Sequence, residues 1–435
     1  MIELKSTERA DNREKTILVG VLLPDSDANL DDPLEEIRGL ADTAGLVLVG
    51  SMLQKRQQPD IATYIGSGKV EELKELVSAH EADLVVFDND LGPAQTRNLE
   101  KLLGVKVIDR TEVILDIFAT RARTHEAHLQ VELAQLQYAM PRLKRMWTHL
   151  SRYKGGIGVR GPGEKQLEED RRLVGHRIQD LKAKLTKVQE RKEREVAARG
   201  DAPTVSLVGY TNAGKSTLMN ALTDAGVLAE DKLFATLDTR TRKWRFGGGG
   251  HVLLSDTVGF IRNLPHALVA SFKATLEEAR QADLLLHVVD ASSPEAEMQI
   301  KAVKDVLEEL GLAEHPTVLV LNKADRVPDR SFLDVLRSHH RDTVTISAAK
   351  GDGLDDLEQA VRESLMNRAL DAEIETGMGN GRVLAYLAQH AQIQSRTYDD
   401  DKQVVLLQCR LPRRCLDFLS ENGAHVRANG ERLYV

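Results

Sequence analysis

The sequence contains only two cysteines, Cys409 and Cys415, among its 435 residues. Two cysteines cannot build a disulfide framework, and their separation does not match the CxxC spacing of metal-binding pairs. A fold stabilised by several disulfides is therefore excluded. The composition instead favours a protein that works in a reducing compartment.

Long hydrophobic runs are also missing. The longest apolar stretches, such as Thr16–Leu23, are far shorter than the ~20 residues that a membrane-spanning helix needs. The N-terminal segment MIELKSTERADNREK is charged and lacks the apolar core of a secretory signal peptide. We therefore expect a cytoplasmic protein without integral membrane insertion, and peripheral attachment of a part of it is the one membrane association left open.

Aromatic residues and excess positive charge are scarce as well. Only 4% of the residues are aromatic, and 59 Lys and Arg face 67 Asp and Glu, which gives a net charge of −8. A generally cationic protein is excluded, and any contact with nucleic acid must depend on local charge more than on stacked rings. The 42% of apolar residues can still form packed cores, and the length suggests about three domains.

Short apolar runs alternate with charged segments of helical spacing in two parts of the chain, which predicts an α/β fold. Over residues 1–110, the N-terminal α/β domain, the expected strands are 17–23, 45–50, 83–88 and 105–109. Over residues 201–366 they are 204–209, 251–256, 284–290, 317–322 and 343–347. Residues 367–435 are predicted to form a small α+β domain with one helix and a strand at 404–411.

Residues 111–200 have a different pattern, in which apolar residues recur at helical spacing in two stripes, 129–150 and 167–188. A glycine-rich stretch, 155–164, separates the stripes and is incompatible with a helix. Together they predict an antiparallel helical hairpin with a flexible tip. Pro141 is expected to kink or break the first arm, because proline lacks the backbone N–H that a helix interior requires.

The predicted hairpin is basic although the whole chain is acidic. Residues 141–172 contain nine Lys and Arg against four acidic residues, a net charge of +5. One interpretation is RNA binding, because the glycines would let the backbone approach a phosphate surface closely. The other is a charged hairpin that is only exposed to solvent. The candidate RNA-binding residues are Arg142, Lys144, Arg145, Arg152, Lys154, Arg160 and Lys165.

Residues 209–216 match the phosphate-binding motif GxxxxGKS, follow an apolar strand and precede a helical segment. Backbone N–H groups of this motif surround the β-phosphate, and the helix N-terminus adds partial positive charge. Lys215 is expected to reach the β- and γ-phosphates, and the Ser216 hydroxyl to coordinate Mg²⁺. The predicted phosphate-binding residues are Gly209, Tyr210, Thr211, Asn212, Ala213, Gly214, Lys215, Ser216 and Thr217.

The motif NKAD begins at the last residue of the expected strand 317–322 and indicates which base the nucleotide carries. The Asp325 carboxylate can accept hydrogen bonds from two adjacent donors on the guanine edge, whereas adenine offers no such pair. The run SAAKG follows the last strand, where its backbone amides can reach the guanine carbonyl. The predicted base-binding residues are Asn322, Lys323, Ala324, Asp325, Ser347, Ala348 and Ala349.

Two further segments are expected to sense the γ-phosphate. Asp256 in DTVG would hold Mg²⁺ through water, with the N–H of Gly259 at the γ-phosphate. In the loop before it, we favour Thr236 as the Mg²⁺ ligand of the triphosphate state over Thr239 and Thr241. The predicted residues of these segments are Phe234, Ala235, Thr236, Leu237, Asp238, Asp256, Thr257, Val258 and Gly259.

One catalytic side chain is missing from this set. Ras-like GTPases place a water-orienting glutamine directly after the DxxG glycine, but Phe260 occupies that position here. Because an apolar ring cannot polarise water, no catalytic residue is assigned, and we expect slow intrinsic hydrolysis until a partner completes the site. Asn212 corresponds to the asparagine of potassium-activated GTPases and is a candidate K⁺ ligand.

A second glycine-rich segment, Tyr64–Lys69, also resembles a phosphate-binding loop. Thr63 stands where the motif requires its first glycine, and Val70 replaces the hydroxyl residue that should follow the lysine. We therefore favour a tight turn between a strand and a helix, which would let this segment touch RNA backbone, over an ATP site.

Over nearly its full length the chain resembles the HflX-type GTPases. The resemblance is carried by the long segments 62–73, 110–143 and 155–172, and by GYTNAGKSTL, FATLDTR, DTVGF, NKAD and SAAKG. It implies an N-terminal α/β domain, a helical linker, a translation-factor-related GTPase domain and, in some members, a C-terminal extension. It also implies binding to the large ribosomal subunit and its rRNA, and the splitting of stalled or stress-arrested ribosomes.

The sequence therefore predicts a monomeric, Mg²⁺-dependent switch that binds GTP and GDP, hydrolyses GTP and acts on the ribosome. One alternative is a signalling GTPase whose hairpin binds a protein at a membrane or protease complex. The other is a nucleotide-gated RNA-binding module with negligible intrinsic catalysis.

Overall fold

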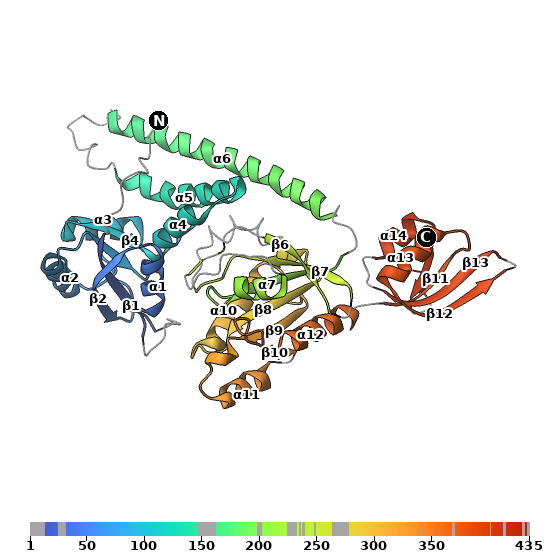
Figure 1. Cartoon of the computed structure of the whole chain (residues 1–435). Helices are drawn as coiled ribbons and strands as arrows, with labels where there is room; N and C mark the ends of the chain where they lie inside the picture. The colour runs from blue at the N-terminus through green and yellow to red at the C-terminus, as the bar shows by residue number, and fades with distance from the viewer. Residues whose placement is uncertain are drawn as a thin grey trace. The chain divides into compact units, whose positions relative to one another are not determined.

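The computed structural model describes most of the chain, and its helices and strands are shown in Figure 1. By its internal contacts the chain falls into two compact units. The first unit is Met1–Arg191, Ala229–Asp238 and Val258–Leu276, and the second is Lys192–Leu228, Thr239–Thr257 and Glu277–Val435. The described residues are 14–24, 32–146, 162–197, 202–223, 233–234, 236, 240–247, 249–262, 278–340, 342–367, 370–400, 402–411, 415–428 and 431–432. Within these ranges, every helix is too short or too polar to cross a bilayer.

A four-stranded parallel sheet forms the core of the first unit, with the strand order β2-β1-β3-β4. The central strands β1 and β3 are almost wholly buried, because both of their faces carry Val, Ile, Leu or Phe. The predicted parallel α/β fold is thus confirmed. The elements are β1 (Lys15–Leu22), α1 (Glu35–Thr43), β2 (Val47–Lys55), α2 (Ser67–His80), β3 (Leu84–Phe87), α3 (Pro93–Leu103) and β4 (Lys106–Asp109).

Three helices follow this sheet: α4 (Arg110–Arg121), α5 (His125–Met146) and α6 (Pro162–Ala197). The apolar stripes of α5 and α6 meet in a small core of Leu129, Leu133, Ile178 and Leu181. An exposed ion pair, Arg177 Nε to Glu132 Oε1 at 2.7 Å, also joins the two helices. The glycine-rich tip predicted between them falls largely in residues 147–161, outside the described part of the chain.

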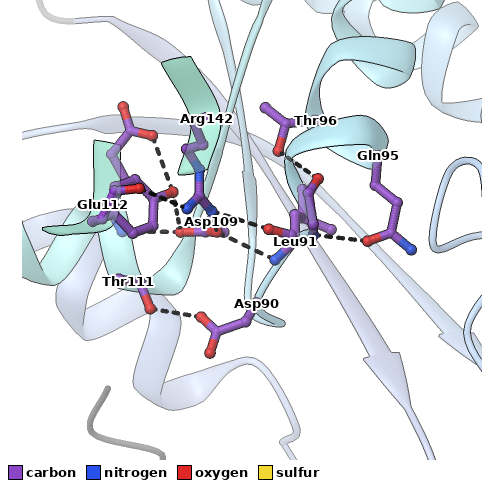
Figure 2. Close-up of polar contacts among 10 residues, drawn as sticks. Asp90, Leu91, Gln95, Thr96, Asp109, Thr111, Glu112 and Arg142 are labelled. Carbon is purple, nitrogen blue, oxygen red and sulfur yellow. Dashed lines mark hydrogen bonds and ion pairs between the residues drawn. The ribbon is translucent and has the colours of Figure 1, made fainter. Parts of the chain in front are cut away.

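The buried carboxylate of Asp109 anchors α5 to the end of β4 (Figure 2). It accepts four hydrogen bonds: from the N–H of Glu112 at 3.0 Å, the N–H of Leu91 at 3.2 Å, the Tyr138 hydroxyl at 2.8 Å and the Arg142 guanidinium at 2.8 Å. Burial raises the pKa of Asp109, and these donors and the arginine charge act in the opposite direction. The cluster supplies a complete set of partners for a charge removed from water.

Two predictions about α5 change as a result. Arg142 was expected to contact RNA, but its guanidinium pairs with Asp109, donates to the Leu91 carbonyl at 3.0 Å and stacks on the Tyr138 ring at 3.4 Å. Pro141 does not break the helix, which continues to Met146. The Arg142 guanidinium also donates to the Tyr138 carbonyl at 3.2 Å, within the helical turn that contains the proline.

The second unit contains a six-stranded sheet in the order β10-β9-β8-β5-β7-β6. Five strands are parallel and lie where the sequence predicts them, whereas β6 is antiparallel to β7 and was not predicted. The elements are β5 (Thr204–Gly209), α7 (Lys215–Thr223), β6 (Arg240–Arg245), β7 (His251–Asp256), β8 (Leu284–Asp290), α10 (Ala296–Glu309), β9 (Thr317–Asn322), η2 (Ala324–Arg326), α11 (Arg330–His339), β10 (Thr343–Thr345) and α12 (Leu354–Asn367).

The remainder of the second unit is an α+β segment with more strands than the sequence predicts. Its antiparallel sheet has the order β12-β13-β11-β14-β15, and α13 and α14 belong to the same apolar core. Cys409 and Cys415 are buried in that core as free thiols. The elements are β11 (Leu370–Gly377), α13 (Gly381–His390), β12 (Gln392–Asp399), β13 (Val404–Leu411), α14 (Cys415–Glu421), β14 (His425–Ala428) and β15 (Glu431–Arg432).

Replacing Arg142 by methionine should lower the free energy of unfolding by about 3 kcal/mol, because Asp109 would stay buried without its charge partner. The matched control is Arg177→Met, which removes an ion pair that is exposed on both sides and should cost no more than about 0.5 kcal/mol. Urea unfolding of the full-length variants measures both values. Equal, small losses would show that Asp109 does not depend on the Arg142 charge.

Candidate nucleotide-binding site

The predicted phosphate- and base-binding motifs meet at one edge of the second unit's sheet. The P-loop follows β5, DTVG starts at the last residue of β7, and NKAD starts at the last residue of β9. Because these strands are parallel, their carboxyl ends lie together, which is where open α/β sheets bind ligands. The fold therefore brings together motifs that are far apart in the sequence.

Two glycines give the P-loop its shape. Gly209 has φ +150°, and a Cβ at that position would collide with the Val288 carbonyl oxygen. Gly214 has φ +93°, and a Cβ there would collide with the Asn322 side-chain amide. Both positions combine a backbone conformation that favours glycine with a lack of space, so any other residue would displace the loop.

Lys215 is buried and its ammonium group points into the P-loop. Its Nζ donates to the carbonyl oxygens of Gly209 at 3.0 Å and Tyr210 at 2.8 Å. Burial lowers the pKa of Lys215 to about 8, and the Asp256 carboxylate acts in the opposite direction. When phosphates bind in a loop of this shape, their oxygens can replace these two carbonyl oxygens as hydrogen-bond acceptors of the ammonium group.

Ser216 and Asp256 form the part of the site that fits a hard cation. The Ser216 hydroxyl donates to Asp256 Oδ2 at 2.9 Å, and the Asp256 side chain is fully buried at the end of β7. Neighbouring Thr257 donates to the Leu207 carbonyl at 2.6 Å, which fixes this strand end against β5. No group of three or more His, Cys, Asp and Glu within the described ranges could hold a metal by itself. A hydroxyl and a carboxylate suit Mg²⁺ that is bound together with nucleotide phosphates.

The base-binding motifs are joined by the buried side chain of Asn322. Its Nδ2 donates to the Ala213 carbonyl at 2.9 Å, and its Oδ1 accepts from the N–H of Ala348 at 3.0 Å. The Asp325 carboxylate accepts from the Ser347 hydroxyl at 2.7 Å, and this hydrogen bond holds the pKa of Asp325 below its usual value. The carboxylate is therefore ionised at neutral pH, as an acceptor for the two donors of guanine must be.

The segments that are expected to sense the γ-phosphate are divided between the two units. Ala229–Asp238 and the residues from Val258 onward belong to the first unit, whereas Asp256 and Thr257 belong to the second. Phe234 is buried with its ring edge-on to Phe118 at 4.6 Å between ring centroids, and its contact with nucleotide stays a prediction. Phe260 is also buried. Thr236 is half-buried, whereas Ala235, Leu237, Asp238 and Thr239 lie outside the described residues.

A buried ion-pair cluster holds the segment after DTVGF within the first unit. Arg110, only 4% exposed, pairs with Asp88 at 2.7 Å and with Glu36. Glu36 also accepts from Arg262 Nε at 3.2 Å, and the Arg262 carbonyl accepts from Arg110 at 3.2 Å. This cluster could not be predicted from the sequence, because its four residues come from distant segments that share no motif.

The remaining candidates are not part of this site. In Tyr64–Lys69, the N–H of Gly66 donates to Gln54 Oε1 at 3.1 Å and Lys69 pairs with Glu72 at 2.7 Å, as in an internally bonded turn. Lys144 and Arg145 belong to α5 and Lys165 to α6, with side chains that are not described. Arg152, Lys154 and Arg160 lie outside the described residues.

Three family models match consecutive parts of the chain. Residues 31–119 match "GTP-binding GTPase N-terminal", residues 121–199 match "GTP-binding GTPase Middle Region", and residues 204–323 match "50S ribosome-binding GTPase". The last match starts at β5 and ends within NKAD, so it contains the P-loop and DTVG. The residues assigned here to phosphate binding therefore belong to a GTPase domain.

Full-length relatives agree with these matches. The chain is 44% identical to "GTPase HflX" of Lacrimispora saccharolytica, over 97% of this chain and 98% of the relative. It is 46% identical to "GTPase HflX" of Escherichia coli, over 93% and 95%. A solved GTP-binding protein from Sulfolobus solfataricus in complex with GDP is 23% identical, covers 81% of this chain and 98% of its own, and has a TM-score of 0.44.

The lowered pKa of Lys215 predicts a pH dependence of GDP binding. Nucleotide phosphates favour the charged amine, so binding should raise that pKa from about 8 and take up a proton wherever the free lysine is neutral. Affinity should then fall as the pH rises from 7 through 8 to 9. Calorimetry in buffers of different ionisation enthalpy should show proton uptake that increases over this range, and none at any pH would contradict the assignment.

Proposed function

Because this chain belongs to the HflX family of GTPases, we propose that it couples GTP hydrolysis to binding of the large ribosomal subunit and to splitting of stalled or stress-arrested ribosomes. The observation that carries the proposal is the continuous match of residues 204–323 to a ribosome-binding GTPase model, with its phosphate and base motifs assembled at one sheet edge. We place the protein in the cytoplasm as a monomer.

Nucleotide recognition is divided between two strand ends. The P-loop N–H groups and the Lys215 ammonium bind the phosphates, with Lys215 exchanging its carbonyl partners for phosphate oxygens. Asp325 reads the guanine edge, and the Ser347 hydroxyl holds this carboxylate in place. A nucleoside triphosphate with adenine would leave Asp325 facing an acceptor, which disfavours ATP.

Ser216, Asp256 and Thr236 would hold Mg²⁺, Asp256 through water. When bound, the ion neutralises charge on the β- and γ-phosphates. The buried Asp256 carboxylate already lies 2.9 Å from the Ser216 hydroxyl, so the two protein oxygens are positioned before nucleotide arrives. Asn212, which has φ +60° in the P-loop, is the proposed K⁺ ligand.

Hydrolysis by the isolated protein should be slow. Phe260 stands where a glutamine would orient the attacking water, and its ring is buried. An apolar ring supplies neither a donor nor an acceptor to water. We therefore infer that the ribosome orders or supplies the missing group.

The nucleotide state is communicated through the segment that follows DTVGF. Asp256 is the last residue of β7, the strand paired with β5 before the P-loop, and six residues farther on Arg262 joins the buried cluster of Glu36, Arg110 and Asp88. A change at the γ-phosphate that moves this short segment must strain or rearrange the cluster, because buried ion pairs tolerate little displacement.

The basic residues at the end of α5, at the start of α6 and between the two helices are the proposed rRNA contact. The proposal now rests on Lys144, Arg145, Arg152, Lys154, Arg160 and Lys165, since Arg142 is committed to Asp109. Lysine and arginine that neutralise RNA phosphates release counterions, which makes binding strongly salt-dependent.

The direct test is GTP turnover by the full-length protein with and without purified ribosomal subunits. Stimulation by the large subunit alone, with little turnover in its absence, is the expected result. A protein that hydrolyses GTP at the same rate whether or not subunits are present would contradict the proposal. Density-gradient analysis of 70S ribosomes then shows whether GTP-dependent splitting occurs.

Removing two charges from the basic segment should weaken ribosome binding. In Lys144→Gln/Arg145→Gln, the slope of log affinity against log salt should flatten by about one to two units. Lys182→Gln/Lys184→Gln is the matched control, because it removes two exposed charges from α6 outside that segment. Co-sedimentation with large subunits at several salt concentrations measures the slopes, and equal slopes for both variants would reject the assignment.

Glu36→Gln should uncouple the ribosome from hydrolysis, because it removes the acid shared by Arg110 and Arg262. We expect stimulation by large subunits to fall about tenfold while GDP affinity stays unchanged. Arg38→Gln is the control on the same helix, where an exposed pair with Asp32 is lost. Full stimulation in Glu36→Gln would mean that the cluster only stabilises the first unit.

A further inference from the structure

Lys323 of NKAD is held by a carboxylate that belongs to none of the motifs. Its Nζ lies 2.7 Å from Asp290 Oδ2, and both side chains are largely buried, at 15% and 20% exposure. Asp290 ends β8 and is paired in register with Asn322 at the end of β9. The ion pair therefore spans two neighbouring strand ends of the nucleotide-binding edge.

Asp290 is itself fixed, and only one of its oxygens is directed to the lysine. Its Oδ1 accepts from the N–H of Ser292 at 3.0 Å and from the Ser292 hydroxyl at 2.6 Å. The N–H of Ala291 donates to the Asn322 carbonyl at 2.9 Å, which ties the same turn to NKAD. The carboxylate is thus oriented before it meets Lys323.

The lysine stem lies beside the P-loop. Lys323 has φ +60°, a backbone conformation that side-chain-bearing residues seldom adopt, and its Cε lies 3.9 Å from the position that a Cβ on Gly214 would take. The apolar part of the side chain therefore runs between the base-binding motif and the phosphate-binding loop. Asp325, the residue proposed to read the base, is two residues farther along the chain, in η2.

We propose that Asp290 is a positioning residue for guanine-nucleotide binding, which holds the Lys323 stem as a preformed wall of the base pocket. The inference rests on the proposed guanine site. A free lysine side chain loses conformational entropy when it is ordered, and a lysine that Asp290 orders in advance does not lose it on binding. The gain is affinity for the base in general, not discrimination by the guanine edge.

Asp290→Asn separates the two roles of this side chain. The amide oxygen can still accept both hydrogen bonds from Ser292, whereas the charge that faces Lys323 is lost. We expect GDP to bind about tenfold more weakly and to dissociate correspondingly faster. The ratio of GDP to inosine diphosphate affinity should stay unchanged, because inosine lacks only the amine that Asp325 reads.

A double-mutant cycle with Lys323→Met completes the test. Methionine keeps an apolar stem and removes the ammonium, so Asp290→Asn should have no further effect on GDP affinity in that background. Equal losses in both backgrounds, or a change below twofold in Asp290→Asn alone, would overturn the proposal. Thermal unfolding of the nucleotide-free variants shows whether the fold is intact.

Asp325→Asn tests the guanine site independently of Asp290. It should collapse the preference for GDP over inosine diphosphate. If that preference persists in Asp325→Asn, the guanine site itself is misassigned. If Asp325→Asn behaves as expected while Asp290→Asn has no effect, only the role of Asp290 is wrong.

Discussion

The buried side-chain amide of Asn322 is the interaction on which the nucleotide site depends. It binds the P-loop through the Ala213 carbonyl and the SAAKG loop through the N–H of Ala348, at 2.9 and 3.0 Å. Its position also requires Gly214, because a Cβ there would occupy the space of the amide. One side chain thus fixes the phosphate loop, the base loop and the last loop of the sheet relative to one another, before any ligand is present.

Two other polar groups prepare the same edge for a charged ligand. Lys215 is buried against two carbonyl oxygens, and the hydrogen bond from the Ser347 hydroxyl lowers the pKa of the Asp325 carboxyl. The ammonium is placed to receive phosphate and the carboxylate to receive hydrogen-bond donors. Preorganised groups of this kind add affinity because binding does not have to order them.

The five parallel strands of the second unit could be predicted because each is a short run rich in β-branched or apolar residues that is followed by a motif or turn. The edge strand β6 could not, since Arg240–Arg245 is polar and only Trp244 faces the core. The order of the nucleotide motifs along the chain is likewise visible in the sequence. Their distances are not, because these depend on strand register.

Ion pairs between distant segments are the part of the structure that sequence patterns do not reveal. Arg142 lies in a basic stretch that predicts RNA binding, but its guanidinium forms an ion pair with Asp109, which is 33 residues earlier in the chain. Arg110 and Arg262 are 152 residues apart and meet through Glu36. A count of the charges in a segment predicts that such residues are exposed to solvent, whereas the fold buries them in ion pairs.

Calorimetric titration of the nucleotide-free protein with GDP and, separately, with ADP tests the central claim most directly. The geometry of Asp325 and Asn322 predicts that GDP binds at least about a hundredfold more tightly than ADP. Equal affinities, or no binding of either nucleotide, would contradict it.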